Sequence, residues 1–217
     1  MERAPFIGIS RHRINLDGKG VTTLACFGGC PLRCRYCLNP QCFEAEKQMW
    51  RSTQEVYDLV RRDQLYFLAT GGGVTFGGGE PLLRSRFIRE FRALCGSYWN
   101  LSVETSLNVE AERVEMLLPI VNHWIVDIKD VDGMVYRAYT GKDNERVISN
   151  LRLLAAQRKA AHVTVRIPLI AGYNDEYHRQ KSIARLQDMG YTDFDLFTYR
   201  TETKPARVIN KNENKPT

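Results

Sequence analysis

The stretch VTTLACFGGCPLRCRYC, residues 21–37, joins a short apolar segment to a loop that carries three cysteines. Residues 21–27 predict a buried strand, and Cys30, Cys34 and Cys37 follow it directly. The first residues contain no continuous apolar segment, so no secretory signal is expected and the six cysteines are expected to be reduced. Reduced thiols concentrated on one loop indicate a metal site or catalysis rather than disulfides.

Two kinds of metal site are compatible with this loop. Structural zinc usually takes four ligands, and here only Cys34 and Cys37 form a C-x-x-C pair, so Cys26 or Cys42 would have to supply the fourth. A cubane [4Fe–4S] cluster held by three thiolates leaves one iron open for a small molecule. The spacing favours the cluster over zinc.

The rest of the chain alternates predicted strands with predicted helices. The predicted strands are 21–27, 71–76, 100–106, 123–129, 162–169 and 193–199. The predicted helices are 52–68, 84–98, 109–121, 144–159 and 176–190. This alternation predicts an α/β fold with a parallel sheet, curved or closed as a barrel, whose chemistry lies at the carboxyl ends of the strands.

Composition limits the remaining possibilities. Apolar residues make up 43% of the 217-residue chain, which suits one domain, expected over residues 1–205, with a polar, disordered tail over 206–217. No apolar run long enough for a membrane span is present, so a cytoplasmic location without membrane contact is expected. The net charge of +6 allows an acidic partner or an anionic ligand. No Lys/Arg block indicates nucleic-acid binding.

Polar residues follow the predicted strands at several points. Gly78, Gly79 and Glu80 come just after the second strand, where glycine allows close backbone approach and Glu80 can accept hydrogen bonds from an ammonium group. Lys129 and Arg166 are cations on otherwise apolar strands. Each either pairs with an internal carboxylate or meets an anionic ligand.

The C-x3-C-x2-C spacing with Tyr36 before the last cysteine resembles the radical S-adenosylmethionine (SAM) superfamily. The phrases GGGVTFGGGEPLL, YTGKDNERVISNL and VRIPLIAGYND resemble the activating enzymes of glycyl radical enzymes, over about residues 18–199. This resemblance implies a partial (β/α)6 barrel of the radical SAM type. It also implies a [4Fe–4S] cluster that reductively cleaves SAM to a 5′-deoxyadenosyl radical. That radical would abstract a glycine α-hydrogen in a partner glycyl radical enzyme, with flavodoxin or ferredoxin as electron donor.

The resemblance also assigns roles to individual residues. Cys30, Cys34 and Cys37 would ligate the cluster, and Glu104 takes the place of an aspartate associated with a monovalent cation. Residues expected to contact SAM are Tyr36, Leu38, Gly78, Gly79, Glu80, Asp127, Lys129, Arg166 and Arg200. Arg200 occupies the place of a cofactor-contacting histidine, which puts that role in question.

Two alternative functions remain open at the level of sequence. The first is a radical SAM enzyme that modifies a peptide or a small molecule, for example a deazapurine precursor. The second is a non-catalytic metal-binding module, which would take metal without cleaving SAM. The cofactor-cleavage reaction distinguishes the second from the first.

Overall fold

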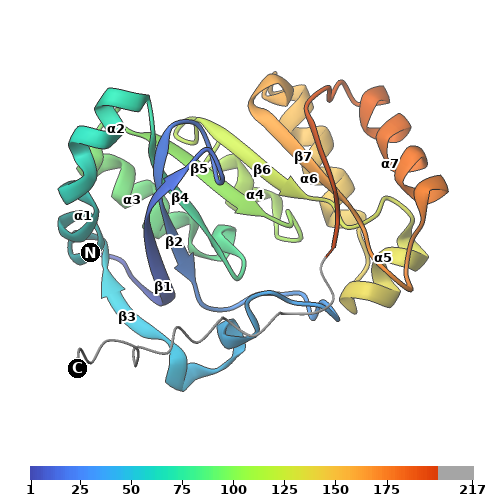
Figure 1. Cartoon of the computed structure of the whole chain (residues 1–217), viewed down its shortest axis with the longest axis horizontal. Helices are drawn as coiled ribbons and strands as arrows, with labels where there is room; N and C mark the ends of the chain where they lie inside the picture. The colour runs from blue at the N-terminus through green and yellow to red at the C-terminus, as the bar shows by residue number, and fades with distance from the viewer. Residues whose placement is uncertain (200–217) are drawn as a thin grey trace, which may run out of the picture.

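The computed structural model describes residues 1–199, in which eight strands form one sheet. The strand order is β3-β1-β2-β4-β5-β6-β7-β8, so β3 and β8 form the two ends of the sheet. Figure 1 shows the strands in a curved row with α1 to α3 beside one half and α5 to α7 beside the other. Arg200, the expected domain end at 205 and the expected tail 206–217 lie outside the described residues.

The strands that run parallel to one another are the predicted ones. They are β2 (Val21–Phe27), β4 (Gly73–Gly78), β5 (Asn100–Thr105), β6 (His123–Asp127), β7 (Val163–Leu169) and β8 (Phe194–Thr198). Their carboxyl ends meet at one edge of the curved sheet. The predicted partial (β/α)6 barrel is confirmed.

Two further strands extend the sheet beyond this prediction. The strand β1 (Arg3–Ile14) pairs antiparallel with both β2 and β3 (Met49–Ser52). Only the first half of β1 is buried, around Ala4 to Phe6, while residues 10–12 are exposed. The sequence therefore lacks the strict alternation that would have revealed this strand.

Helices and short 3₁₀ turns connect the strands. The helices are α1 (Thr53–Val60), α2 (Gln64–Thr70), α3 (Ser85–Cys95), α4 (Ala111–Glu115), α5 (Gly133–Thr140), α6 (Glu145–Ala156) and α7 (Glu176–Asp188). The 3₁₀ turns are η1 (Pro40–Phe43), η2 (Ala45–Lys47), η3 (Arg61–Asp63), η4 (Pro81–Arg84) and η5 (Ala160–His162). No helix within residues 1–199 has the length and apolar character needed to cross a bilayer.

The helix predicted over 52–68 is split in two by a tertiary contact. Its start is confirmed, because Ser52 and Glu55 form a reciprocal capping box. The η3 turn then separates α1 from α2 at Asp63, which is fully buried. Asp63 accepts hydrogen bonds from Arg11 Nε at 2.8 Å and from Thr23 Oγ1 at 3.1 Å. A buried carboxylate needs such partners, and they come from β1 and β2.

Two other helices differ from the prediction. Residues 109–121 form only the short α4, and the chain then runs through turns toward Pro119, which cannot donate a helical hydrogen bond. The helix α5 was not predicted. Asp132 caps it by accepting hydrogen bonds from the backbone of Met134 and Val135. Asp132 as an N-cap residue was the feature of the sequence that could have predicted the start of this helix.

Aromatic side chains fill the space between the first half of the sheet and α3. Phe27 and Phe76 stack with ring centroids 5.5 Å apart, and Phe76 meets Phe91 edge-on at 5.2 Å. Each buried phenylalanine stabilises the fold by about 1.5–3 kcal/mol. This packing fixes the carboxyl ends of β2 and β4 relative to one another.

Candidate functional site

The cysteine loop leaves β2 and crosses the carboxyl ends of the parallel strands. Figure 1 shows this segment running from β2 beneath the strand ends to α5. At its start Gly29 N donates to Cys42 O at 2.8 Å, and further along Arg33 N donates to Thr140 O at 2.9 Å. The protein's own backbone therefore holds the loop at both ends.

A cavity of about 150 Å³ lies between this loop and the strand ends. Its wall consists of Cys30, Leu32, Cys34, Cys37, Leu38, Asn39, Gly78, Gly79, Glu104, Thr105, Ser106, Asp127, Lys129, Arg166 and Tyr199. The tertiary structure thus brings the predicted site residues that it describes together in one cavity, apart from Tyr36 and Glu80. We call it the cysteine cavity.

The donor set of the cysteine cavity fits a cluster better than a single ion. Within the described residues, no three Cys, His, Asp or Glu side chains converge on a point that one metal ion would occupy. A cubane takes each thiolate on a different iron, so its ligands surround a volume instead of meeting at a point. Neither Cys26 nor Cys42, the candidate fourth zinc ligands, lines the cavity. Three soft thiolates suit iron–sulfur chemistry.

The thiols of the loop lie in different electrostatic surroundings. Burial raises the pKa of Cys30 to about 12 and also raises the pKa of Cys34. A hydrogen bond from the Cys42 thiol lowers the pKa of Cys37 to about 6. Cys42, considered above as a possible fourth zinc ligand, is buried and 1% exposed.

The Gly78–Gly79 turn approaches the cysteine loop too closely for side chains. Gly78 has φ of +92°, and a Cβ there would stand 2.7 Å from Cys26 Cβ. A Cβ on Gly79 would stand 2.2 Å from the carbonyl oxygen of Gly29. Both positions therefore require glycine, and the turn presents its backbone to the cavity.

Glu80 lies behind this turn and is 1% exposed. One carboxylate oxygen accepts hydrogen bonds from Leu82 N at 3.1 Å and Thr105 Oγ1 at 2.6 Å. The other accepts from Ser106 N at 2.9 Å and Ser106 Oγ at 2.7 Å. Burial raises the pKa of Glu80, and these hydrogen bonds oppose that effect. The side chain fastens the end of β5 to the turn after β4.

Lys129 follows β6 in a left-handed backbone conformation, with φ of +63°. Its Nζ lies 3.2 Å from Asp127 Oδ2 and 5.8 Å from the ring centre of Tyr199. Burial lowers the pKa of Lys129, but the nearby negative groups, Asp127 foremost, outweigh burial and raise it. Lys129 therefore stays charged at the wall of the cavity.

Arg166 forms the other cationic part of the wall. Its Nη1 lies 2.7 Å from Glu104 Oε1, and its Nε lies 3.2 Å from Asp127 Oδ1. The contact with Asp127 is an ion pair without hydrogen-bond alignment, because neither atom has a hydrogen-bond partner. Burial raises the pKa of Glu104 to about 7 despite Arg166. Arg166 therefore pairs with internal carboxylates, as one alternative expected, and it also lines the cavity, where it could meet an anionic ligand, as the other expected.

Tyr36 lies beside the cavity in an aromatic group. Its hydroxyl donates to Ala171 O at 3.4 Å. Its ring lies 6.1 Å from that of Tyr139 and 6.0 Å from that of Tyr173. Leu38 is 60% exposed and lines the cavity at its rim.

A sequence profile of the Radical SAM superfamily matches residues 24–180 of the chain, which include the cysteine loop and the strands β4 to β7. The chain belongs to the radical SAM superfamily. It is an enzyme of the radical SAM type, not the non-catalytic module considered as an alternative. Membership implies a [4Fe–4S] cluster and SAM as cofactors.

Curated relatives of this radical SAM enzyme match most of its length. The (2S)-3-sulfopropanediol dehydratase activating enzyme of Klebsiella oxytoca is 27% identical over 82% of this chain and 75% of that protein. The pyruvate formate-lyase 2-activating enzyme of Escherichia coli K12 is 28% identical over 78% of this chain and 68% of that protein. Both are similar to this chain over about four-fifths of its length.

Solved structures confirm the radical SAM fold. Streptococcus suis SuiB superposes with a TM-score of 0.61 at 16% identity, covering 81% of this chain and 39% of SuiB. Native anSMEcpe with bound AdoMet and Cp18Cys peptide superposes with a TM-score of 0.57 at 18% identity, covering 79% and 48%. At these identities the likeness concerns the fold alone.

Sequence reasoning missed several residues of this radical SAM site. Asn39 lines the cysteine cavity and donates from Nδ2 to Gly78 O at 3.0 Å, which ties the cysteine loop to the glycine turn. Thr105 and Ser106 line it from the end of β5, and Tyr199 from the end of β8. Thr105, Ser106 and Tyr199 stand at the carboxyl ends of predicted strands, which was their sequence signal, and Asn39 closely follows Cys37.

Proposed function

We propose that the chain is the activating enzyme of a glycyl radical enzyme. In this reaction it removes an α-hydrogen atom from a glycine of the partner protein. The observation that carries the proposal is the cysteine cavity, where three thiols and the Gly78–Gly79 turn face one another. The similarity to two activating enzymes over about four-fifths of the chain supports it.

Cys30, Cys34 and Cys37 are the residues that would hold the [4Fe–4S] cluster. When bound, the cluster and SAM supply the 5′-deoxyadenosyl radical that takes the hydrogen atom. The backbone hydrogen bonds at Gly29 and Arg33 hold the loop in place before the cofactors bind. The protein's contribution at this point is to preorganise three sulfur ligands.

The remaining cavity residues would bind and orient SAM. The backbone of Gly78 and Gly79 can approach the methionine part closely, as their lack of side chains allows. Lys129 supplies a positive charge for a carboxylate, and Asp127 an acceptor for hydroxyl groups. We assign Tyr36 and Leu38 to the adenine side. The role proposed for Arg200 lies outside the described residues.

Glu80 acts on this site from behind the wall. Three of its four hydrogen bonds come from Thr105 and Ser106, so these residues present a fixed surface to the cavity. The fourth comes from Leu82 N in η4. We therefore propose that Glu80 positions the binding turn through these bonds. A direct contact between its carboxylate and the ammonium group of SAM stays a prediction.

Arg166 already lies at the position where the sequence predicts a monovalent cation, beside Glu104. The guanidinium already contacts Glu104 and Asp127, and it brings a permanent positive charge to both. We propose that Arg166 supplies the positive charge that a bound cation would otherwise supply.

The partner glycine would enter through the mouth of the cysteine cavity, at the carboxyl ends of the strands. Fixing the hydrogen donor and the radical at one distance is the main task of the protein in such a step. An electron for each turnover would come from a reduced flavodoxin or ferredoxin.

The test is an anaerobic assay with the glycyl radical enzyme encoded nearest to the gene of this chain. We expect a glycyl doublet by electron paramagnetic resonance when SAM and a reductant are present. With a partner deuterated at its glycine α-carbons, deuterium should appear in 5′-deoxyadenosine. Cleavage of SAM without a glycyl signal or deuterium transfer would instead support the peptide or small-molecule alternative.

A pair of cysteine variants tests the ligand set independently of the partner. Cys34→Ala should lose most of the bound iron and the absorbance of the cluster, because one of three ligands is missing. Cys42→Ala should keep both, since Cys42 does not line the cysteine cavity. Equal loss in the two variants would show that Cys42 is a fourth ligand and would contradict the proposal.

A further inference from the structure

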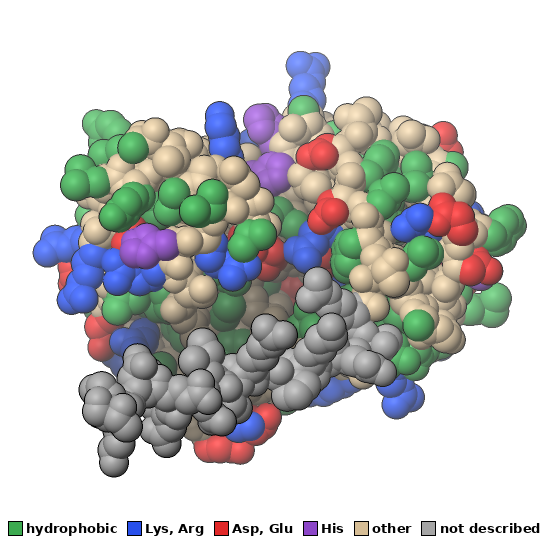
Figure 2. All heavy atoms as spheres, in the orientation of Figure 1, with side chains coloured by type: hydrophobic (Ala, Val, Ile, Leu, Met, Phe, Trp, Pro, Cys, Tyr) green, Lys and Arg blue, Asp and Glu red, His purple; other side chains and the backbone are tan. Residues whose placement is uncertain are grey.

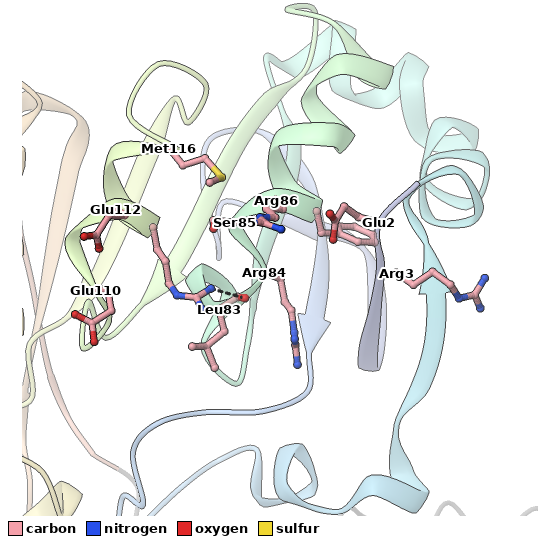
Figure 3. A pocket seen from close by; sticks show the side chains of 11 residues that line it. Glu2, Arg3, Leu83, Arg84, Ser85, Arg86, Glu110, Glu112 and Met116 are labelled. Atoms are coloured by element: carbon pink, nitrogen blue, oxygen red, sulfur yellow. Dashed lines mark hydrogen bonds between the residues drawn. The ribbon is translucent and has the colours of Figure 1, made fainter.

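A second cavity of about 460 Å³ lies outside the cysteine cavity, between η4, the start of α3, α4 and the first residues of the chain. Arg84, Ser85 and Arg86 form one side of it, and Arg113 and Glu112 belong to α4 (Figure 3). None of these residues lines the cysteine cavity. We call it the Arg84 cavity.

Arg84 and Arg113 carry charges that no carboxylate of the described residues neutralises. Within residues 1–199 neither guanidinium forms a salt bridge. Arg84 Nε is buried without a hydrogen-bond partner. Arg113 Nη1 donates to the carbonyl oxygen of Leu83 at 2.8 Å, the dashed line in Figure 3. A half-buried cation without a carboxylate is costly unless a ligand compensates it.

The charge of Arg113 also destabilises the charge of Arg84. Burial lowers the pKa of Arg84, and the neighbouring positive charge of Arg113 lowers it further. Like charges held together inside a hollow are a typical arrangement for binding an anionic group. The exposed Arg86 adds a third cation at the edge.

The Arg84 cavity lies directly behind the cysteine loop. Arg84 Nη2 stands 3.7 Å from the position that a Cβ on Gly29 would take. Gly29 precedes Cys30, and its carbonyl oxygen accepts a hydrogen bond from Glu80 N at 2.8 Å. Figure 3 shows the Arg84 side chain extending toward the ribbon of this loop. A partner seated on Arg84 would therefore be close to the cluster without entering the SAM side.

We propose that the Arg84 cavity is the docking surface for an acidic protein that donates one electron to the site. The inference rests on the proposed function only in that a radical SAM enzyme needs an external electron. One electron leaves the reduced cofactor of the donor, which is oxidised by one equivalent, and enters the metal group held by the thiols, which is reduced. No atom is transferred. Carboxylates of the donor would pair with Arg84 and Arg113.

The acidic residues around the cavity set the direction of approach. Glu110 pairs with Arg146 at 2.5 Å, while Glu112 is exposed. In Figure 3 Glu110 and Glu112 lie together on the α4 side, away from Arg84. Glu2, the third carboxylate of the wall, lies on the opposite side near Arg86. An acidic donor would be repelled from both of these sides and drawn to η4, where Arg84 lies between them.

The test compares a protein donor with a chemical reductant. The double variant Arg84→Gln/Arg113→Gln and a matched control, Arg62→Gln, on an exposed arginine of η3, are reconstituted with iron and sulfide. With limiting reduced flavodoxin, we expect the rate of SAM cleavage in the double variant to fall about tenfold, because steering and pairing charges are lost. With dithionite, the rate should change by less than about twofold, since a small reductant needs no docking surface.

A binding measurement gives a second readout that needs no turnover. The dissociation constant for oxidised flavodoxin should rise about tenfold in the double variant and stay unchanged in Arg62→Gln. In the wild type it should rise with ionic strength, and in the double variant this salt dependence should be weaker.

Four outcomes would overturn the proposal. The first is an equal rate of flavodoxin-driven SAM cleavage in the wild type and the double variant, and the second is a loss of rate in the double variant that is as large with dithionite as with flavodoxin. The third is an unchanged dissociation constant for flavodoxin in the double variant. The fourth is saturation of the cavity by millimolar inorganic phosphate that leaves flavodoxin binding intact. The last would identify a small-anion site. A failure of the activase proposal is distinguishable, because it would remove the glycyl signal and leave the flavodoxin results unaffected.

Discussion

Arg166 Nη1 on β7 lies 2.7 Å from Glu104 Oε1 on β5, across the intervening strand β6. The same guanidinium lies 3.2 Å from Asp127 Oδ1, so one fixed cation serves two carboxylates in the cavity wall. Removing one partner of such a pair leaves a poorly solvated charge that seeks another counter-ion. The contacts of Arg166 therefore predict how SAM binding depends on monovalent cations.

Arg166→Met should make SAM binding dependent on a monovalent cation. We expect the dissociation constant for SAM in the wild type to change less than about twofold between potassium and tetramethylammonium buffers. In the variant it should rise about tenfold in tetramethylammonium and recover in potassium, because the two carboxylates then need a mobile cation. Isothermal titration of the reconstituted protein measures this, with the exposed Arg152→Met as control. A wild-type protein that requires potassium would contradict the role given to Arg166.

Glu80→Gln should destabilise the fold although it preserves the shape of the side chain. The new amide group would face two of the donors that now bind the carboxylate, so hydrogen bonds to Thr105 or Ser106 are lost. The unfolding free energy should fall by about 2–3 kcal/mol, measured by urea denaturation. Glu115→Gln, at an exposed position of α4, should change it by less than about 0.5 kcal/mol. Similar values for the two variants would show that the Glu80 hydrogen bonds contribute little.

Gly79→Ala should separate the glycine turn from the cysteine loop. The added methyl group would stand 2.2 Å from Gly29 O, so the backbone must move. We expect iron content after reconstitution to fall at least about twofold, while the circular dichroism spectrum keeps its helical signal. Gly8→Ala is the matched control, because nothing lies within 4 Å of a Cβ at that position. Full iron incorporation in Gly79→Ala would show that the loop tolerates the shift.

His123 should make stability dependent on pH. Burial lowers the pKa of His123 below its ordinary value of 6.5, and its ring contacts Thr164 Oγ1 at 3.0 Å. Below pH 6.5 the unfolded chain binds a proton that the folded protein binds less readily, so the unfolding free energy falls as pH falls. Above that pH both states are neutral at this residue, and the contribution is constant.

Urea denaturation of His123→Gln between about pH 8 and about pH 5.5 checks this expectation. The wild type should lose stability relative to the variant as the pH drops. Arg152→Gln, at an exposed position of α6, should follow the wild-type curve. Parallel curves for wild type and His123→Gln would show that the residue titrates alike in both states.

Local patterns in the sequence predicted the parallel part of the fold well. The six predicted strands are β2 and β4 to β8, because each is a short apolar run between turn residues. The strands β1 and β3 were missed because their pairing joins distant segments, and β1 is only half buried. The break in the predicted helix 52–68 likewise comes from Asp63, whose partners Arg11 and Thr23 lie far away in the chain.

Residue spacing along the chain was enough to predict the chemistry of the site, because spacing within one loop sets how many thiolates can face one cluster. It also predicted a glycine turn, since Gly78 and Gly79 follow a predicted strand. The folded chain was needed to show that a Cβ on Gly79 would meet Gly29 O, and that Arg84 reaches Gly29. It was also needed to show how Arg166 shares its charge between Glu104 and Asp127. These contacts depend on the order and curvature of the strands, which no local periodicity of the sequence records.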